Sequence, residues 1–324
     1  MSRSRRLDDD SRAEFAAGLR LRISDFGMRV SNSAPFRNRT TRNYETRRAR
    51  HSSVLPTLKD GDEAVAQELR LRDIATRLVH LDARAAAAAG QAVDWLRRHH
   101  PTDTVGYLPL HLLEDDPALF LWGLAEDNLD IAESHIGLPV RYLGLEVRAE
   151  RAVPAGSRHP VRHWHFDVED RRMLKIIVYL TDVDADTGPF EFLSQPASDL
   201  ARQTLRVRPG LTFLPDAAVS ATVPASDWHS VTGPAGTAVY ADTARLLHRI
   251  KAPTGGDRYS ATFVYTSDRP RHTLSRFMPP RHIVRSVLPH LTARQVRALN
   301  PAATVGTAPD RKTLPEALID RSSS

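Results

Sequence analysis

The stretch YSATFVYTS, residues 259–267, decides the fold. Its side chains alternate in kind, with Tyr259, Ala261, Phe263 and Tyr265 on one face and hydroxyl residues or valine on the other. Successive side chains of a β-strand point to opposite faces, so this pattern predicts a strand with two different faces. The same enrichment in Val, Ile, Tyr and Thr recurs in three earlier stretches, 140–153, 173–183 and 237–242. These stretches are predicted strands too.

Gly and Pro signals such as DADTGP and GPAGT punctuate the predicted strands, with no helix between each successive pair. This organisation favours an antiparallel sandwich or barrel over a parallel, doubly wound sheet. We therefore expect a mainly β protein with flanking helices, an α+β arrangement, whose all-β core covers about 140–270.

Helical patterns precede and follow this core. Apolar residues recur at helical spacing from Asp62 to about His99, and a second helical stretch is predicted from Asp116-Pro117 to near Gly137. After the core, Thr292 with Gln295 has the pattern of a capping box. We expect helices over 60–137 and a helical tail over 281–324.

Positive charge is concentrated at the start of the chain. Residues 1–52 hold 13 Arg against 6 acidic residues, a balance of +7, so the rest carries −1 of the total +6. This segment is predicted to be a basic, partly disordered arm, and 53–324 a single domain. A role for the arm in binding an anionic substrate or nucleic acid stays open, although, besides Phe36 at its start, 36–51 offers only one aromatic, Tyr44, for base stacking.

Cysteine is absent from the 324 residues, which excludes disulfides, thiolate metal sites and cysteine nucleophiles. Any metal must therefore be held by His, Asp or Glu. No stretch approaches the roughly 20 apolar residues that a membrane helix needs, and the first residues lack the apolar core of a secretory signal. We expect a cytoplasmic protein without a membrane partner; its oligomeric state is not predicted.

A crowded polar stretch, HWHFDVEDRR at 163–172, lies just before the strand at 173–183. On a strand, His165 and Asp167 point to the same side and can offer an imidazole and a carboxylate to one cation. Two histidines and one carboxylate on one face of an octahedral ion form the ligand set of non-haem Fe(II) oxygenases. A His-x-Asp pair alone is weak evidence, because a histidine at a strand end can equally bond to a neighbour.

A second stretch strengthens this interpretation. In GTAVYADTARLLHRIKAPTGGDRYSATFVYTS, one strand leads to His248, a Gly-rich turn follows, and the next strand begins at Arg258. A guanidinium one hairpin away from a metal ligand is suited to bidentate binding of a carboxylate, and Ser260 on the same strand face could add a hydroxyl. A 2-oxo dicarboxylic acid could thus chelate iron at one end and meet Arg258 at the other. His229 competes for the third ligand position, but no Arg follows it at a suitable distance.

Together these motifs resemble the Fe(II)/2-oxoglutarate-dependent oxygenases, and within them the phytanoyl-CoA dioxygenase-like group. The resemblance spans about 140–270 and rests on HWHFD, LKIIVYLTDVDADTGPFEFL, GTAVYADTARLLHR and DRYS. It implies a double-stranded β-helix, a jelly roll of cupin-like form, with Fe(II), 2-oxoglutarate and O2 as cofactor and cosubstrates. Carried over residue by residue, the iron ligands are His165, Asp167 and His248, and the partner of the 2-oxoglutarate 5-carboxylate is Arg258.

Four further residues are candidates with open alternatives. Ser260, Tyr179 and Lys175 could contact 2-oxoglutarate, although a packing role for Tyr179 is as plausible. His163 could contact substrate or support the metal ligands, or lie at the rim. The segment SQPASD after FEFL departs from the family pattern, so the loop there is expected to be rebuilt.

The resemblance implies hydroxylation of an unactivated C–H bond of a small molecule, an amino acid derivative or specialised metabolite. Desaturation, epoxidation and ring closure are variants of the same chemistry. Asp167 stands where the halogenating relatives have a small residue, so halogenation is not expected. Two alternatives stay open: an oxygenase acting on a nucleic-acid or carrier-bound substrate, for which the motif match is poor, and a non-catalytic jelly-roll binding protein.

Overall fold

The computed structural model describes residues 34–100, 103–152, 162–273 and 275–300. Its contacts divide the chain into two units, Met1–His51 and Ser52–Ser324. In the first unit the described part of the basic arm is one helix, α2 (Ala34–His51), with Arg48, Arg50 and His51 in its last turn. The rest of the arm and the tail from 301 lie outside the described residues, so the partial disorder expected in the arm and the helical structure expected beyond 300 stay predictions.

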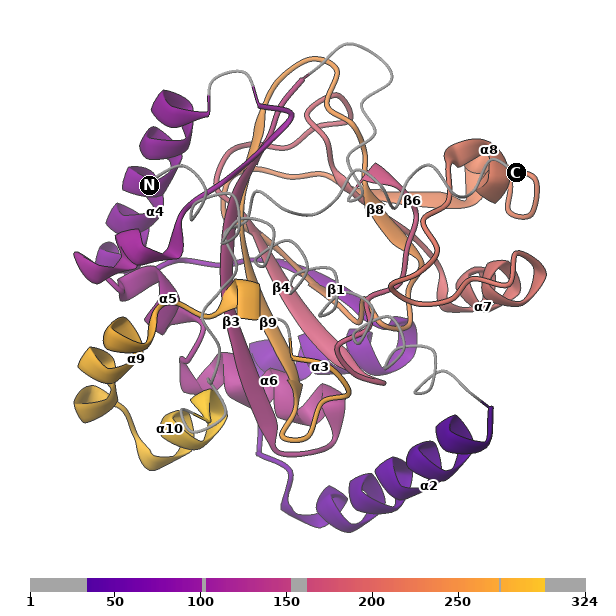
Figure 1. Cartoon of the computed structure of the whole chain (residues 1–324), viewed down its shortest axis with the longest axis horizontal. Helices are drawn as coiled ribbons and strands as arrows, with labels where there is room; N and C mark the ends of the chain where they lie inside the picture. Colours follow the sequence, from indigo (N-terminus) through magenta and orange to yellow (C-terminus); the bar gives the residue numbers. More distant parts are fainter. Residues whose placement is uncertain (1–33, 101–102, 153–161, 274, 301–324) are drawn as a thin grey trace, which may run out of the picture. The chain divides into compact units, whose positions relative to one another are not determined.

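Two antiparallel sheets form the centre of the second unit (Figure 1). The larger has the order β1-β7-β4-β9-β3-β2, with bounds β1 (Ile74–Leu78), β7 (Thr237–Ala241), β4 (Met173–Tyr179), β9 (Arg258–Ser267), β3 (Val140–Glu150) and β2 (Val105–Tyr107). The smaller has the order β6-β5-β8, with bounds β6 (Trp228–Val231), β5 (Phe190–Leu193) and β8 (His248–Ile250). The four stretches predicted as strands all contribute to the larger sheet.

The chain alternates between the two sheets in the manner of a double-stranded β-helix. An isolated bridge between His165 and His248 adds the segment after 162 to the smaller sheet, beside β8. From β3 the chain passes to this segment, returns to β4, crosses to β5 and β6, returns to β7, crosses to β8 and ends on β9. The predicted fold class, a mainly β protein with flanking helices and a jelly-roll core, is confirmed.

The space between the sheets is apolar at one end. Ile177 and Val239 of the large sheet pack with Phe190 and Ile250 of the small sheet in one buried cluster. A second cluster, centred on Trp164 and Phe166, lies beside it and includes apolar residues of α7 and α8. This core holds the two sheets together, because burying apolar side chains from both faces removes them from water.

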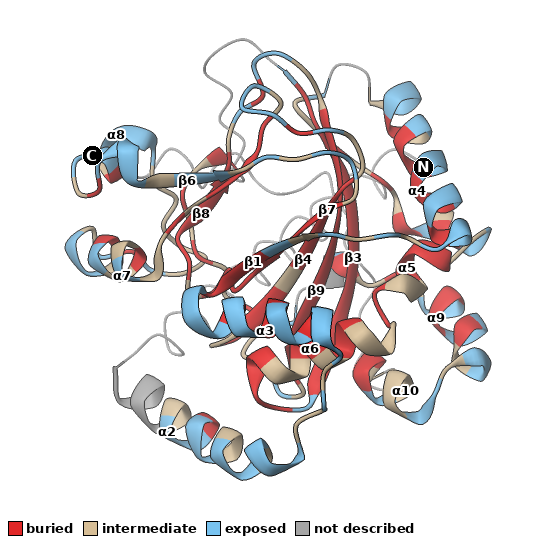
Figure 2. Ribbon diagram, turned by 180° about the vertical axis from the view of Figure 1, so that it is seen from behind, coloured by how far each residue is buried: buried red, intermediate tan, exposed pale blue. Residues whose placement is uncertain are grey.

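Helices cover the outer face of the large sheet, whose four central strands β7, β4, β9 and β3 are almost wholly buried (Figure 2). The helices that contact it are α3 (Asp60–Arg72), α4 (Ala83–His99), α6 (Glu126–Ile136) and α10 (Ala293–Leu299). The remaining helices are α5 (Ala118–Trp122), α7 (Gln195–Thr204), α8 (Asp216–Ser220) and α9 (Arg281–Val287). Short 3-10 helices are η1 (Ser52–Val54), η2 (Leu110–Glu114), η4 (Ala225–Asp227), η5 (Ser275–Phe277) and η6 (Leu288–His290).

Helix ends follow the signals in the sequence. The side chain of Asp82 accepts bonds from two backbone amides at the start of α4. The predicted capping box of Thr292 and Gln295 is present at the start of α10. α6 ends at Gly137, which adopts φ 73°, a left-handed conformation that glycine takes without strain. Such caps satisfy backbone groups that a helix leaves unpaired.

Two expectations are wrong in detail. Residues Ile74–Leu78, taken as part of a helical pattern, form β1 and pair with β7 along their whole length. The physical reason is non-local: Asp73 ends α3 at φ 60°, which turns the chain toward an open edge of the large sheet. The segment expected to be a rebuilt loop after FEFL is α7, with Pro196 in its first turn.

Among the described residues, no helix combines the length and apolar character needed to cross a membrane.

Candidate metal centre

Main-chain pairing brings the three predicted ligands together. His165 and His248 exchange both backbone bonds, at 3.0 and 3.1 Å, and the amide of Asp167 donates to the carbonyl of Thr243 at 3.0 Å. The loop 242–247, which leads from β7 to β8, therefore holds the strand that carries His165 and Asp167. One ligand atom from each of the three residues lies within 4.8 Å of the other two.

Hydrogen bonds leave the correct nitrogen of each histidine free for a metal. His165 Nδ1 lies 2.7 Å from the carbonyl oxygen of His163, and His248 Nδ1 lies 3.0 Å from that of Leu246. A carbonyl oxygen only accepts, so each Nδ1 carries the proton and each Nε2 keeps its lone pair. Such bonds orient metal-ligating histidines in general. The three residues therefore fit a divalent metal ion of the Fe(II) kind.

Electrostatics keep the three groups in the form that binds a cation. Burial lowers the pKa of His165, and burial together with the neighbouring His165 lowers that of His248 to about 3, so both rings are neutral at pH 7. Burial opposes ionisation of Asp167, but the charge of the Lys175 ammonium, which also donates a hydrogen bond to the carboxylate, outweighs it and holds the pKa of that carboxyl well below its usual range. A charged carboxylate beside two neutral imidazoles is the binding form.

Lys175, expected to contact 2-oxoglutarate, places its ammonium against Oδ2 of Asp167 in an ion pair. It comes from β4, and its side chain is 12% exposed. A cosubstrate that chelates a metal at this point would meet the Lys175 ammonium beside the ligand carboxylate. The expected role remains a prediction.

Arg258 begins β9 and is wholly buried. Its Nη1 donates to the carbonyl of Gly188 at 2.8 Å, while Nε and Nη2 have no hydrogen-bond partner among the described residues. Burial of a charged donor without a partner is costly, and a bound carboxylate would remove that cost. These two free donors fit the predicted role of Arg258.

Ser260 and Tyr179 are directly paired across β9 and β4, two residues along β9 from Arg258. The Ser260 hydroxyl is buried and also lacks a partner within the described structure. The Tyr179 hydroxyl, in contrast, donates to the carbonyl of Val231 at 2.8 Å and accepts from the amide of Phe190 at 3.1 Å. Ser260 therefore keeps its capacity for a ligand, whereas Tyr179 is engaged in linking the two sheets.

Two other histidines lie outside the metal group. The carbonyl oxygen of His163 accepts from His165, while the ring nitrogen Nε2 of His163 is buried with no hydrogen-bond partner among the described residues. His229, which competed for the third ligand position, lies on β6 and is exposed, with its ring stacked on that of Phe192 at 5.0 Å between centroids. It is not part of the group of possible metal ligands.

A row of charged residues on β3 was missed by sequence reasoning. Glu146, Arg148 and Glu150 alternate on one face of this strand and are all buried. In register, Arg148 pairs with Ser260 and Glu150 with Arg258. Alternation of charge with apolar residues in VRYLGLEVRAE is the only local signal, and it is typical of a solvent-facing strand surface.

A second triad, Asp73, His135 and Asp242, also has the spacing of a metal group. Its groups are already engaged: His135 Nε2 lies 2.9 Å from Asp242 Oδ2, and Arg245 Nη1 lies 2.9 Å from Asp73 Oδ1. The other oxygen of Asp242 accepts from the amide of Ala244 at 3.2 Å. We interpret this triad as a buried polar network that fixes the start of the loop leading to His248.

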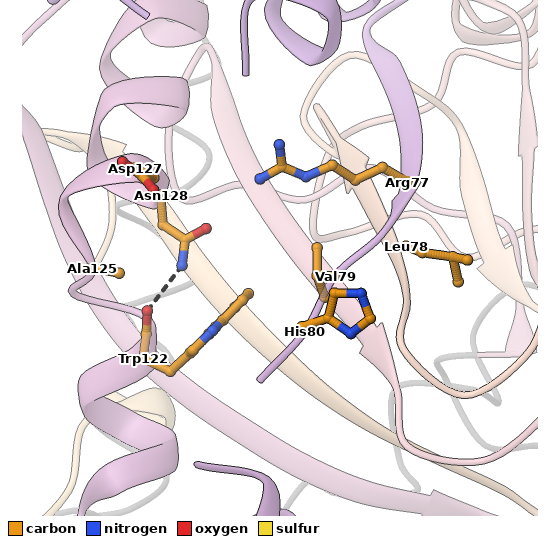
Figure 3. A pocket seen from close by; sticks show the side chains of 8 residues that line it. All are labelled: Arg77, Leu78, Val79, His80, Trp122, Ala125, Asp127 and Asn128. Carbon is orange, nitrogen blue, oxygen red and sulfur yellow. Dashed lines mark hydrogen bonds between the residues drawn. The ribbon is translucent and has the colours of Figure 1, made fainter. Parts of the chain in front are cut away.

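A surface pocket of about 260 Å³ lies between the end of β1 and the α5–α6 corner (Figure 3). Two of its polar side chains are held by neighbours: Arg77 Nε donates to the Tyr240 hydroxyl at 3.1 Å, and Asn128 Nδ2 donates to the carbonyl of Trp122 at 2.8 Å. None of its lining residues belongs to the metal group. The pocket is therefore separate from the group of possible metal ligands.

No family model and no curated protein matches the chain. Solved structures do. The chain is similar to the non-heme alpha ketoglutarate dependent epimerase SnoN from nogalamycin biosynthesis, with 18% identity, a TM-score of 0.46, and coverage of 65% of this chain and 84% of that one. It is also similar to HygX from Streptomyces hygroscopicus with nickel and 2-oxoglutarate bound, with 15% identity, a TM-score of 0.47, and coverage of 65% of this chain and 88% of that one.

A third similar structure is EctD from S. alaskensis with bound Fe, with 15% identity, a TM-score of 0.47, and coverage of 70% of this chain and 83% of that one. All three likenesses are distant. Function is therefore inferred from the geometry of the site itself.

Proposed function

We propose that this protein is an Fe(II)/2-oxoglutarate-dependent oxygenase whose iron is held by His165, Asp167 and His248. The observation that supports it most is the pair of Nδ1–carbonyl bonds, which turn both Nε2 atoms into free ligands beside a buried carboxylate. Two histidines and one carboxylate leave positions open for a chelating cosubstrate and O2. A structural metal site would instead be expected to close its coordination with protein ligands.

The second support is the group around Arg258 on the neighbouring strand. Its free Nε and Nη2, with the free hydroxyl of Ser260, offer three donors to one end of a 2-oxo dicarboxylate. His165 and Asp167 come from a segment of the smaller sheet and Arg258 from the larger, so a cosubstrate of this kind would lie between the sheets.

The residues of the chain would do the following work. His165, Asp167 and His248 hold the metal, and Lys175 neutralises part of the Asp167 charge. Arg258 and Ser260 orient the distal carboxylate. When bound, iron with 2-oxoglutarate and O2 supplies the oxidising power for attack on a C–H bond, while 2-oxoglutarate leaves as succinate and CO2. Apolar neighbours such as Phe190, whose ring lies 5.5 Å from that of His248, keep water from the site.

We propose that the substrate is a small molecule and that the reaction is hydroxylation. A polar compound, such as an amino acid derivative, is favoured because Glu146, Arg148 and Glu150 lie buried on the face of β3 that pairs with Arg258 and Ser260. Of the described part of the chain, α2 carries the basic residues of the arm. A role for α2 in binding a larger anionic substrate has no further support.

The test is spectroscopic. Fe(II) and 2-oxoglutarate are added to the metal-free protein without oxygen, and the visible charge-transfer band of the chelate is recorded. We expect a band in the wild-type protein and none in His248→Ala. A wild-type protein that binds Fe(II) but forms no band with 2-oxoglutarate would exclude the proposed cosubstrate, and one that binds no Fe(II) would exclude the metal site.

A further inference from the structure

Glu150 stands directly opposite Arg258 in the large sheet, where β3 pairs with β9. Both side chains are wholly buried. Glu150 Oε1 lies 3.9 Å from Arg258 Nη2, too far for a hydrogen bond but within the range of an ion pair. The residue expected to bind an incoming carboxylate thus already faces a carboxylate of the chain.

Three guanidinium groups share this one carboxylate. Besides Arg258, Arg148 Nε lies 3.3 Å from Oε1, and Arg162 Nε lies 3.9 Å from Oε2. Neither oxygen of Glu150 has a hydrogen-bond partner in the described part of the chain. The carboxylate is therefore held by charge rather than by directed bonds, and Arg258 keeps free donors although its counter-charge is close.

The charges around Arg258 act in opposite directions. Burial above all, with smaller contributions from Arg148 and Arg162, lowers the pKa of Arg258 to about 10, and the charge of Glu150 opposes this shift. Glu150 thus stabilises the buried cation when no other anion is bound. The same negative charge repels a second carboxylate that approaches Arg258, because like charges at such distances interact strongly in a buried site.

We propose that Glu150 competes with the cosubstrate for Arg258. The charge of Glu150 weakens the binding of a distal carboxylate by Arg258 and so lowers the affinity of the site for 2-oxoglutarate. This inference rests on the proposed function. The affinity is lowered for the dicarboxylate product as well, since succinate carries the same distal group. Glu150 would thereby favour release of the product and let the site turn over.

The experiment measures cosubstrate affinity in Glu150→Gln, which keeps the shape of the side chain and removes its charge. The Fe(II) protein is titrated without oxygen with 2-oxoglutarate and, separately, with 2-oxopentanoate, which has the same length but no distal carboxylate. We expect the variant to bind 2-oxoglutarate roughly tenfold more tightly, with little change for 2-oxopentanoate. Thermal unfolding gives an independent readout, because 2-oxoglutarate should raise Tm more in the variant than in the wild type.

Glu146→Gln is the matched control. It removes the same charge from the same strand face, but Glu146 pairs with Thr262 rather than with Arg258, so we expect an unchanged affinity for 2-oxoglutarate. Glu150→Asp is a second variant that keeps the charge for Arg148 and Arg162 while drawing it back from Arg258. The affinity of Glu150→Asp for 2-oxoglutarate should lie between those of the wild type and Glu150→Gln. If Glu150→Gln does not fold, Glu150→Asp tests the inference in its place.

Unchanged or weaker binding of 2-oxoglutarate in a folded Glu150 variant would overturn the inference, as would equal tightening of both ligands. Failure of the proposed function looks different. In that case the wild-type protein itself would form no complex with 2-oxoglutarate, before any variant is compared.

Discussion

His248 Nε2 lies 3.8 Å from Oδ2 of Asp167, and the two side chains are 6% and 8% exposed. The contact joins the start of β8 to the segment before β4, and the backbone bonds between His165 and His248 and from Asp167 to Thr243 hold the two segments together. Neither side chain depends on a flexible surface loop for its position. A metal site built in this way is largely formed before the ion arrives, which lowers the cost of binding.

Removal of either partner should abolish metal binding. We expect His248→Ala and Asp167→Ala to weaken Fe(II) binding by roughly 100-fold or more, measured by equilibrium dialysis without oxygen, because each removes one of three ligands. His229→Ala is the control, since this exposed histidine lies on β6 outside the metal group. A comparable loss in His229→Ala would contradict the assignment.

The stability of the metal-free protein should fall as the pH is lowered from about 6.5 toward 3. Burial, with the neighbouring His165, lowers the pKa of His248 to about 3 in the folded protein, while an unfolded histidine titrates near 6.5. Between these values the unfolded state binds the extra proton, so the free energy of unfolding decreases with falling pH, by about 1.4 kcal/mol per pH unit for one such group. Urea denaturation at several pH values measures this slope.

His248→Gln isolates the contribution of one histidine to that slope. The variant should show a shallower dependence by about one proton, whereas His229→Gln should follow the wild type. An identical slope in His248→Gln and the wild type would show that the folded protein protonates His248 as readily as the unfolded one.

Arg258→Met should weaken 2-oxoglutarate binding by roughly 10- to 100-fold, because the variant loses the charged donors that a distal carboxylate would use. Arg258→Lys should recover part of the affinity through charge without the bidentate geometry. The control is Arg141→Met, another buried arginine, which pairs with Thr266 at the other end of β9. The charge-transfer titration described above compares them, and equal losses at Arg258 and Arg141 would argue against a specific contact.

Local patterns in the sequence predicted four strands of the large sheet, and the three residues predicted as iron ligands lie together in the structure. Their binding of iron stays a prediction. The alternation along 259–267 and the spacing of His165 and Asp167 could be interpreted locally, because side chains at positions i and i+2 of a strand point to the same face. The strand Ile74–Leu78 was missed because its Ile and Leu are four residues apart, a helical spacing, while its actual partner β7 is far along the chain. Glu150 was missed for a related reason: only the register of β3 against β9 shows that it faces Arg258.

Glycine provides a last test, because two positions should respond to the same substitution in opposite directions. Gly144 lies at an irregularity of β3 with φ 122°, and a Cβ there would meet the carbonyl oxygen of Phe277 at 1.9 Å. Gly144→Ala should therefore destabilise the fold by about 3 kcal/mol or more.

Gly90 lies within α4 on an exposed face, and a Cβ there meets nothing within 4 Å. Gly90→Ala should stabilise by about 0.5–1 kcal/mol, since alanine favours helix and restricts the unfolded chain. Urea denaturation of both variants checks the pair, and a stable Gly144→Ala protein would mean that η5 does not pack on β3 as the structure shows.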